Sequence, residues 1–238
     1  MQKHSTTSVA CVVVILASSL AVSREALAAE QFRIVPGESE LRVLVFRSGS
    51  LARLAHNHVI SSTALSGTLT AGDTAAGSSL DIHLPVDSLV VDDARVRAEE
   101  GRAFSAEVSE KDVHGTRRNM LGPRLLQAGE FDSIRVSSTS ISGDFPDLKI
   151  EADIMIRGAR HVVELPAIVE RYDDRIVATG SADVAHSELG LSPFTAALGT
   201  MRVGDQMTFK YRVVATKIAS GPPATEQSAA GARAGDLR

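Results

Sequence analysis

The amino-acid sequence predicts a mostly β, antiparallel domain, either a sandwich or a barrel, with one helical insertion. Short segments in which apolar and polar residues alternate follow one another over most of the chain after residue 30, as expected of half-buried strands. Turn residues separate these segments, for example at Ala71-Gly72-Asp73 and Tyr172-Asp173-Asp174. Many short strands separated by turn signals are typical of antiparallel sandwiches and barrels.

The alternation is clearest in residues 41–46, 148–156 and 207–213. Successive side chains of a strand point to opposite faces. In the first segment the two faces carry Leu41, Val43 and Val45 on one side and Arg42, Leu44 and Phe46 on the other. In the second segment the apolar face carries Leu148, Ile150, Ala152, Ile154 and Ile156. Such a stripe fits a filled core and a hollow lumen equally well.

Residues 92–127 break this pattern, since they are rich in Ala, Glu, Arg and Leu. Ser109 followed by Asp112 resembles a capping box, which predicts a helix beginning there. Pro123 is expected to stop that helix. The insertion therefore falls between two predicted strands of the domain.

The first 28 residues are predicted to be a cleaved signal peptide. A short segment with Lys3 leads into the apolar run Val9–Val22, and Ala26-Leu27-Ala28 fits the small-x-small pattern before a cleavage point. The alternative is a membrane anchor, but the run is shorter than the roughly 20 residues that a spanning helix needs. We therefore expect a periplasmic or secreted protein, with a domain at 30–217 and a disordered tail at 218–238.

Charge and cysteine content exclude several functions. The formal net charge is −4 and no block of basic residues occurs, so a nucleic-acid partner is not expected. The single cysteine, Cys11, lies inside the signal peptide. The mature chain then has no disulfide, thiolate zinc site or cysteine nucleophile.

A series of short motifs, each a strand with a turn, follows in a set order along the chain. These motifs are 34–39 with 41–46, Ser66-Gly67-Thr68-Leu69, Pro85-Val86-Asp87-Ser88-Leu89, Asp112-Val113-His114, Glu130-Phe131-Asp132-Ser133-Ile134, 156–163, 187–191 and 203–207. In their order and spacing they resemble the YceI family of exported lipid-binding proteins over about residues 32–215. Glu38 stands where that family usually has a histidine.

This resemblance implies an antiparallel eight-stranded lipocalin-like barrel with a helical insertion, whose lumen holds an isoprenoid chain such as a quinone or polyprenyl lipid. Aromatic residues are only 4% of the chain, so few large side chains are available to fill a wide barrel. The resemblance and this scarcity together favour a hollow lumen. No cofactor is then expected apart from the bound isoprenoid lipid. Transient contact with a membrane is also expected, and the sequence does not indicate the oligomeric state.

Eight residues are candidates for ligand binding. The apolar candidates are Phe46, Ile154, Ile156, Phe194 and Phe209, which we expect in the lumen wall. The polar candidates are His56, His58 and His114, which we expect at the barrel mouth. On a strand, His56 and His58 share a face, and with His114 they could instead bind a divalent metal.

An enzyme is not expected, because the chain has no G-x-S-x-G, P-loop or G-x-G-x-x-G motif. Two alternatives to the lipid-binding function remain. The first is a metal- or haem-associated accessory protein that uses the histidines, and the second is a structural stress-response module with a solid core and no ligand.

Overall fold

The computed structural model describes residues 29–196 and 200–219. The predicted signal peptide and almost all of the predicted tail lie outside these residues. The strands are β1 (Glu30–Ile34), β2 (Glu40–Ser48), β3 (His58–Ser62), β4 (Ser66–Ala71), β5 (Ser79–Pro85), β6 (Val90–Val91), β7 (Ser133–Asp144), β8 (Asp147–Ile156), β9 (Ala159–Arg171), β10 (Arg175–Ala185), β11 (Thr195–Ala196) and β12 (Met201–Lys217).

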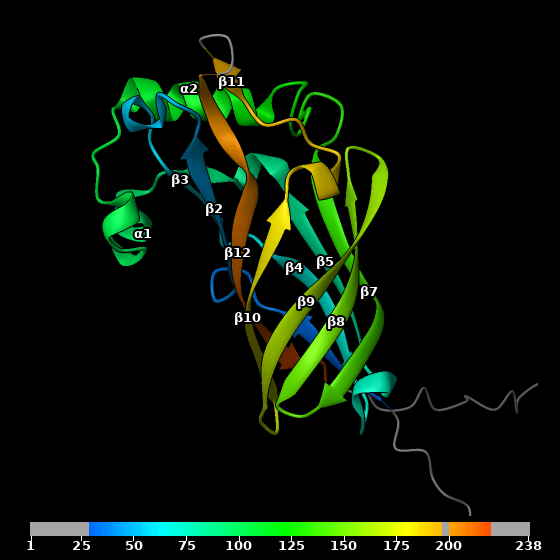
Figure 1. Ribbon diagram of the computed structural model, residues 1–238. Coiled ribbons are helices and arrows are strands. Elements are labelled where there is room, and N and C mark those ends of the chain that lie inside the picture. The colour runs from blue at the N-terminus through cyan, green and yellow to red at the C-terminus, as the bar shows by residue number, and fades with distance from the viewer. Residues whose placement is uncertain (1–28, 197–199, 220–238) are drawn as a thin grey trace, which may run out of the picture.

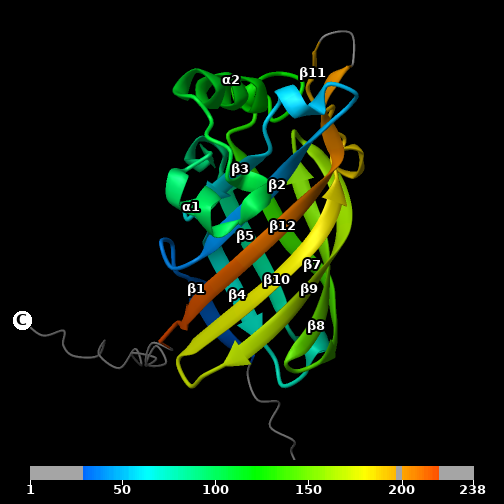
Figure 2. The ribbon, with the colours of Figure 1, turned by 60° about the vertical axis from the view of Figure 1, so that its left-hand side comes forward.

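Eight of the strands close into the antiparallel barrel that the sequence and the family resemblance predicted (Figures 1 and 2). They follow the order β1-β4-β5-β7-β8-β9-β10-β12, and β12 returns to β1 through the pairs Phe32↔Lys217 and Ile34↔Ala215. Full closure leaves these strands without a free edge. The barrel is closed by the pairing of β1 with β12, the first and last strands of the described chain, which lie far apart in the sequence.

Strand β12 pairs with β1 along one part of its length and with β2 along another. The turn between β1 and β2 contains Ser39, whose hydroxyl donates to the Val214 carbonyl and accepts from the Val214 N–H. This side chain therefore replaces backbone pairing at the interruption. Beyond it, β12 pairs with β2, and β3 and β6 extend the sheet outward from β2. The barrel wall is thus supplemented at this end by strands outside the eight-stranded ring.

The helical insertion follows β6 and consists of α1 (Ala94–Glu99) and α2 (Glu110–Leu121). The Ser109 hydroxyl accepts from the Asp112 N–H, which confirms the predicted start of α2. The helix ends at Leu121, two residues before Pro123. Figure 1 shows α2 across one end of the barrel, near β11, and α1 on its outer side. Short 3₁₀ turns lie at Ala52–Leu54, Ala75–Gly77, Val86–Ser88, Arg102–Phe104 and Ser187–Leu189.

The apolar residues form two clusters. The larger one lies inside the barrel, and the smaller one lies between the outer face of β2–β3 and the insertion, where it contains Leu44, Val59, Val96 and Phe104. The second cluster explains why both faces of β2 are partly apolar. Within the described residues, no helix has the length and hydropathy required to cross a membrane.

Candidate functional site

The barrel encloses a cavity of about 620 Å³ at the end covered by α2. This volume lies within the range of small-molecule sites, roughly 300–1,000 Å³. Inward-facing apolar side chains from most of the barrel strands form its wall, including Val43, Val45, Leu69, Ile82, Val136, Ile150, Leu165 and Val213. These positions are the inward half of each alternation, so the strand pattern creates the apolar wall directly.

The opposite end of the barrel is filled by side chains. Phe32, Ile34, Ile141, Leu148, Ile176 and Ala215 are buried there and do not line the cavity. Phe32 is paired with Leu69, which does line it, so the packed region begins directly below the hollow one. The interior is therefore solid at one end and hollow at the α2 end.

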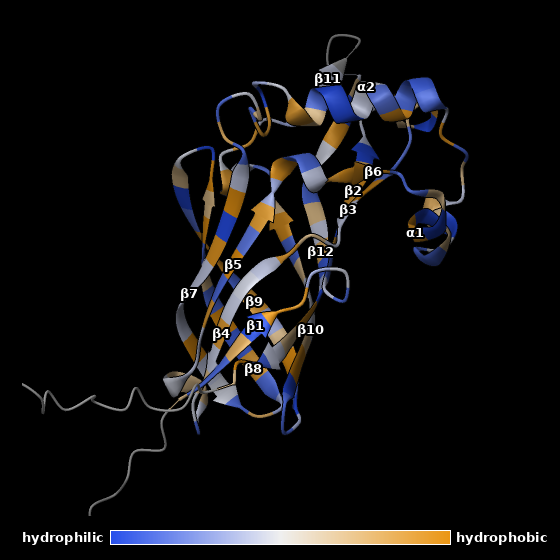
Figure 3. Ribbon diagram, turned by 180° about the vertical axis from the view of Figure 1, so that it is seen from behind, coloured by the Kyte–Doolittle hydropathy of each residue, from blue (hydrophilic) through white to orange (hydrophobic). Residues whose placement is uncertain are grey.

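Helix α2 covers the hollow end with a polar surface. Its residues in the cavity lining are Lys111, Asp112, Gly115, Thr116, Arg118, Asn119 and Met120. Only Met120 of this helix is buried, and Figure 3 shows α2 coloured mostly as hydrophilic. A helix that covers an apolar core normally turns an apolar stripe toward it. Here, instead, the apolar barrel wall is covered by a helix whose residues in the cavity lining are mostly polar.

The structure places six of the eight candidate residues in the cavity lining: His56, His58, Ile154, Ile156, Phe194 and Phe209. His58 begins β3, whereas His56 lies just before that strand rather than on it. The two rings are arranged edge to face, with 6.4 Å between their centroids and 71° between their planes.

Phe46 and His114 lie elsewhere. Phe46 packs outside the barrel against Phe104, with 5.7 Å between ring centroids, because it shares a face with Leu44 rather than with Val45. His114 is exposed on α2 and does not line the cavity. In the described part of the chain, no three His, Cys, Asp or Glu side chains lie together as a metal ion would require. The three histidines proposed as metal ligands thus do not converge.

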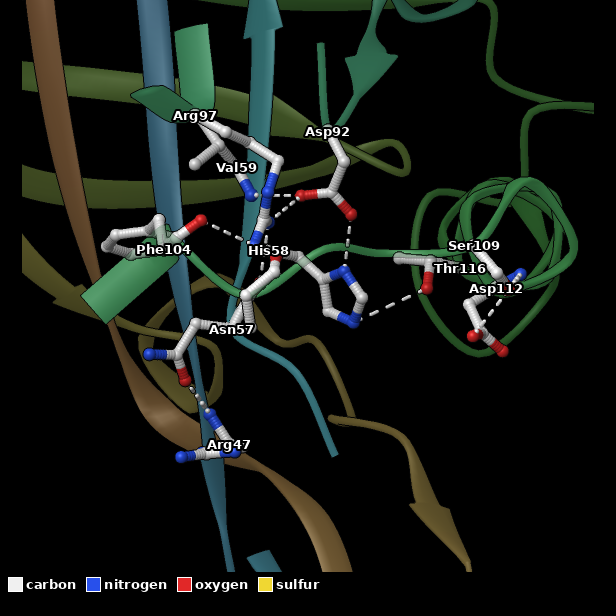
Figure 4. A network of polar contacts seen from close by, with 11 residues as sticks. Arg47, Asn57, His58, Val59, Asp92, Arg97, Phe104, Ser109, Asp112 and Thr116 are labelled. Atoms are coloured by element: carbon white, nitrogen blue, oxygen red, sulfur yellow. Dashed lines mark hydrogen bonds and ion pairs between the residues drawn. The ribbon is translucent and has the colours of Figure 1, made fainter. Parts of the chain in front are cut away.

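His58 belongs to a buried polar network centred on Asp92 (Figure 4). The Asp92 Oδ2 lies 2.6 Å from His58 Nδ1, and its Oδ1 accepts from the Val59 N–H at 2.9 Å and from Arg97 Nη1 at 2.5 Å. The Arg97 guanidinium also donates to the carbonyls of Asn57, Phe104 and Ala106. Every hydrogen-bonding oxygen of this carboxylate therefore has a partner, as a buried charge requires.

The network fixes the charge of Asp92 and the tautomer of His58. Burial disfavours the ionised carboxylate, but the hydrogen bonds from His58, Val59 and Arg97 outweigh burial and hold the pKa of Asp92 below its usual value. Because an ionised carboxylate only accepts hydrogen bonds, His58 Nδ1 carries a proton. Its Nε2 then faces Thr116 of α2, 3.5 Å from the Thr116 hydroxyl. The network thereby connects β3 at the cavity mouth to both helices of the insertion.

Sequence reasoning missed Asp92 and Arg97 as parts of the site. An Asp followed five residues later by an Arg, like Asp92 and Arg97, occurs at the beginning of many helices. No local sequence pattern indicates that Arg97 is buried. It also missed Tyr211, which lines the cavity and donates to the Pro166 carbonyl at 2.5 Å. The opposing residue, Gly180, gives this ring its space.

The fold and the cavity define a class of proteins, lipocalin-like barrels with an internal apolar site. A family model, YceI-like domain, matches residues 32–215. The chain therefore belongs to the YceI-like family.

Among the solved structures similar to this chain, two illustrate the shared fold. BcnA from Burkholderia cenocepacia is 12% identical, with a TM-score of 0.54 over 76% of this chain and 98% of that one. A polyisoprenoid-binding domain from Saccharophagus degradans, implicated in plant cell wall breakdown, is 10% identical, with a TM-score of 0.52 over 80% and 99%. No curated protein matches the chain. At these identities the likeness concerns the fold.

Proposed function

We propose that this protein is an exported lipid-binding protein that holds one long isoprenoid chain in the barrel lumen. The observation that supports it most is the apolar cavity of about 620 Å³ between a packed barrel end and α2. The polyisoprenoid-binding domain with the same fold points to the same class of ligand. The N-terminal 28 residues, with their apolar run and Ala26-Leu27-Ala28, support export.

The cavity sets the scale of the ligand. Since an engineered apolar cavity of about 150 Å³ holds one benzene, or about 25 Å³ per carbon, a cavity of about 620 Å³ shields about 25 carbons, roughly five isoprene units. Burial contributes about 0.8 kcal/mol per CH₂, offset by the loss of chain freedom on binding. A chain of this length can therefore bind through apolar contact alone.

The mouth also offers a surface for transient membrane contact. Leu54 and Phe194 line the cavity, yet their exposed fractions are 61% and 41%. Exposed apolar side chains at the entrance of a lipid site are suited to insert between lipid headgroups. Membrane contact at this end would bring the cavity to the pool from which a lipid is taken.

The function is tested by native purification, organic extraction and mass spectrometry of the extract. We expect an isoprenoid lipid in near-stoichiometric amount. The Ala178→Trp variant places an indole in the lumen, because Ala178 lines the cavity, and it should purify folded but without lipid. Thr179→Trp is the matched control, since the next residue of β10 points to the outer face. A lipid-free wild type, or equal lipid in both variants, contradicts the proposal.

Export is tested separately. The protein is expressed with its full N-terminus, and the species outside the cytoplasm is sequenced from its N-terminus. We expect it to begin after Ala28. A species that keeps residues 1–28 and stays membrane-bound would support the anchor instead.

A further inference from the structure

The charged side chains at the α2 end of the cavity indicate which kind of head group the bound lipid carries. This inference rests on the proposed function. Four cationic side chains line the cavity at this end: Arg47, Lys111, Arg118 and Arg202, here called the cationic rim. Among the described residues of the lining, Asp112 is the one carboxylate, and its Oδ2 accepts from the Ser109 hydroxyl. The rim is thus strongly positive on a chain whose formal net charge is −4.

Within the part of the chain that the structure describes, no carboxylate forms an ion pair with a rim cation. Among residues 29–196 and 200–219, the ion pairs involve other basic side chains, such as Arg42 with Glu99 and Lys217 with Glu30. Arg47 donates to the Ala55 carbonyl, and a neutral acceptor leaves its charge uncompensated. Basic side chains outside the lining, such as Arg33 and Arg95, also form no ion pair among the described residues, so the rim is distinguished by the gathering of four cations around one cavity with a single carboxylate in its lining.

Helix α2 contributes to the rim through one face. Lys111, Gly115 and Arg118 are spaced by four and three residues, which aligns them along the helix, and all three line the cavity. Gly115 adds no side chain between the two cations. A closing helix that served only to exclude water would present apolar residues here. The geometry instead suits a ligand with an apolar tail below and an anionic group at this level.

Shape and charge act together at this position. The apolar wall excludes water below the rim, and low-dielectric walls focus the field of nearby charges into the opening. A phosphate at the end of the chain would lie between these cations without losing all contact with solvent. A quinone ring, being neutral, would gain little from four unpaired cations.

We infer that the cavity binds an isoprenoid chain that ends in an anionic phosphate head, held by the cationic rim, in preference to the same chain with a neutral head. The phosphate and the chain are recognised together, because the tail is needed to hold the head at the rim.

The inference is tested by displacement of the neutral fluorophore Nile red from delipidated protein. The competitors are geranylgeranyl phosphate, geranylgeraniol and inorganic phosphate. We expect geranylgeranyl phosphate to bind at least about tenfold more tightly than the alcohol, about 1.4 kcal/mol. This preference should shrink as NaCl is raised, because salt screens exposed charges. Inorganic phosphate should not displace the fluorophore.

The Lys111→Gln/Arg118→Gln variant tests the rim directly. It should lose about tenfold in affinity for geranylgeranyl phosphate and keep its affinity for the alcohol within about twofold. The matched control is Arg33→Gln/Lys149→Gln, which removes the same charge from exposed positions outside the cavity lining. Arg47 is kept, because it also holds the Ala55 carbonyl.

Each other outcome has a defined meaning. Equal binding of phosphate and alcohol to the wild type overturns the anionic head and leaves the lipid-binding function intact. A phosphate preference that survives in the rim variant overturns the role of Lys111 and Arg118. Displacement by inorganic phosphate alone overturns the joint recognition of head and chain. Failure of both geranylgeranyl compounds to bind contradicts the proposed function itself.

Discussion

The Asp92 carboxylate accepts a hydrogen bond from the His58 ring at 2.6 Å, which ties the strand at the cavity mouth to the residue from which the helical insertion begins. Asp92 has a φ of +55°, a left-handed conformation that Asp and Asn adopt more easily than most residues. Its side chain also holds the buried Arg97 guanidinium. One residue thus sets both the backbone turn and the polar contacts of the insertion.

Asp92→Asn should destabilise the protein by about 3 kcal/mol, because breaking a buried ion pair leaves Arg97 with an uncompensated charge. Asparagine keeps the left-handed turn, so the loss reports the carboxylate and not the backbone. The measurement is the free energy of unfolding in urea. Asp173→Asn is the control, as Asp173 is exposed in a turn. A change below about 0.5 kcal/mol would show that the network does not stabilise the fold.

The stability that Asp92 contributes should depend on pH. Its pKa is lower in the folded state than the ordinary value of 3.8, so the contribution is complete above that value. It is lost as the pH falls from 3.8 through the folded-state pKa, because protonation then favours the unfolded chain. The difference in unfolding free energy between wild type and Asp92→Asn should therefore shrink below about pH 4. A difference that stays constant down to pH 2 would contradict this.

Tyr211 should titrate at high pH. Burial raises its pKa from 10.0 to about 12. In a Tyr172→Phe background Tyr211 is the only remaining tyrosine, so absorbance at 295 nm follows its ionisation alone. The neutral form is favoured in the folded state, so its contribution is complete below pH 10 and is lost as the pH rises from 10 towards 12. Ionisation near pH 10 in the folded protein would disprove the burial of the phenol.

Gly180→Ala should be destabilising, by about 2 kcal/mol, as is typical of overpacking. A Cβ at this position would lie 2.1 Å from the Pro166 carbonyl oxygen and 2.5 Å from the Tyr211 hydroxyl. The backbone oxygen cannot move aside cheaply, so β9 and β10 must separate. Gly129→Ala serves as control because no atom lies within 4 Å of its added Cβ. Equal thermal unfolding temperatures for the two variants would contradict the close approach of Tyr211.

Local patterns in the sequence predicted most of the strands. Alternation placed β2 and β8 correctly, because each strand has one face toward the barrel interior. The start of α2 was predicted because a cap is a contact between residues three apart, Ser109 and Asp112. The family resemblance supplied the number of strands and the closed barrel. Strand alternation alone also fitted a sandwich, since the closing pair Ile34↔Ala215 joins distant segments.

The site was predicted less completely than the fold. The alternation of side chains along a strand separates its two faces, but it does not indicate which face points into the barrel lumen. Phe46 was therefore assigned to the wall, although the insertion gives the outer face of β2 an apolar cluster of its own. The Asp92–Arg97 pair depends on how the insertion folds back on β3, which no spacing rule indicates. The cationic rim unites residues of β2, α2 and β12, and only the three-dimensional arrangement brings them together.

The side chains that fill the barrel end opposite α2 close the cavity at its bottom, so the cavity opens only at the α2 end among the described residues. Under the proposed function, a chain that enters past α2 would stop where Phe32 and Ile34 fill the interior. A shorter chain would then leave part of the cavity empty, and a longer one would leave its surplus carbons in water. The fixed depth of the cavity would therefore select a bound chain by its length, whereas the apolar wall offers few groups that distinguish chains in other ways.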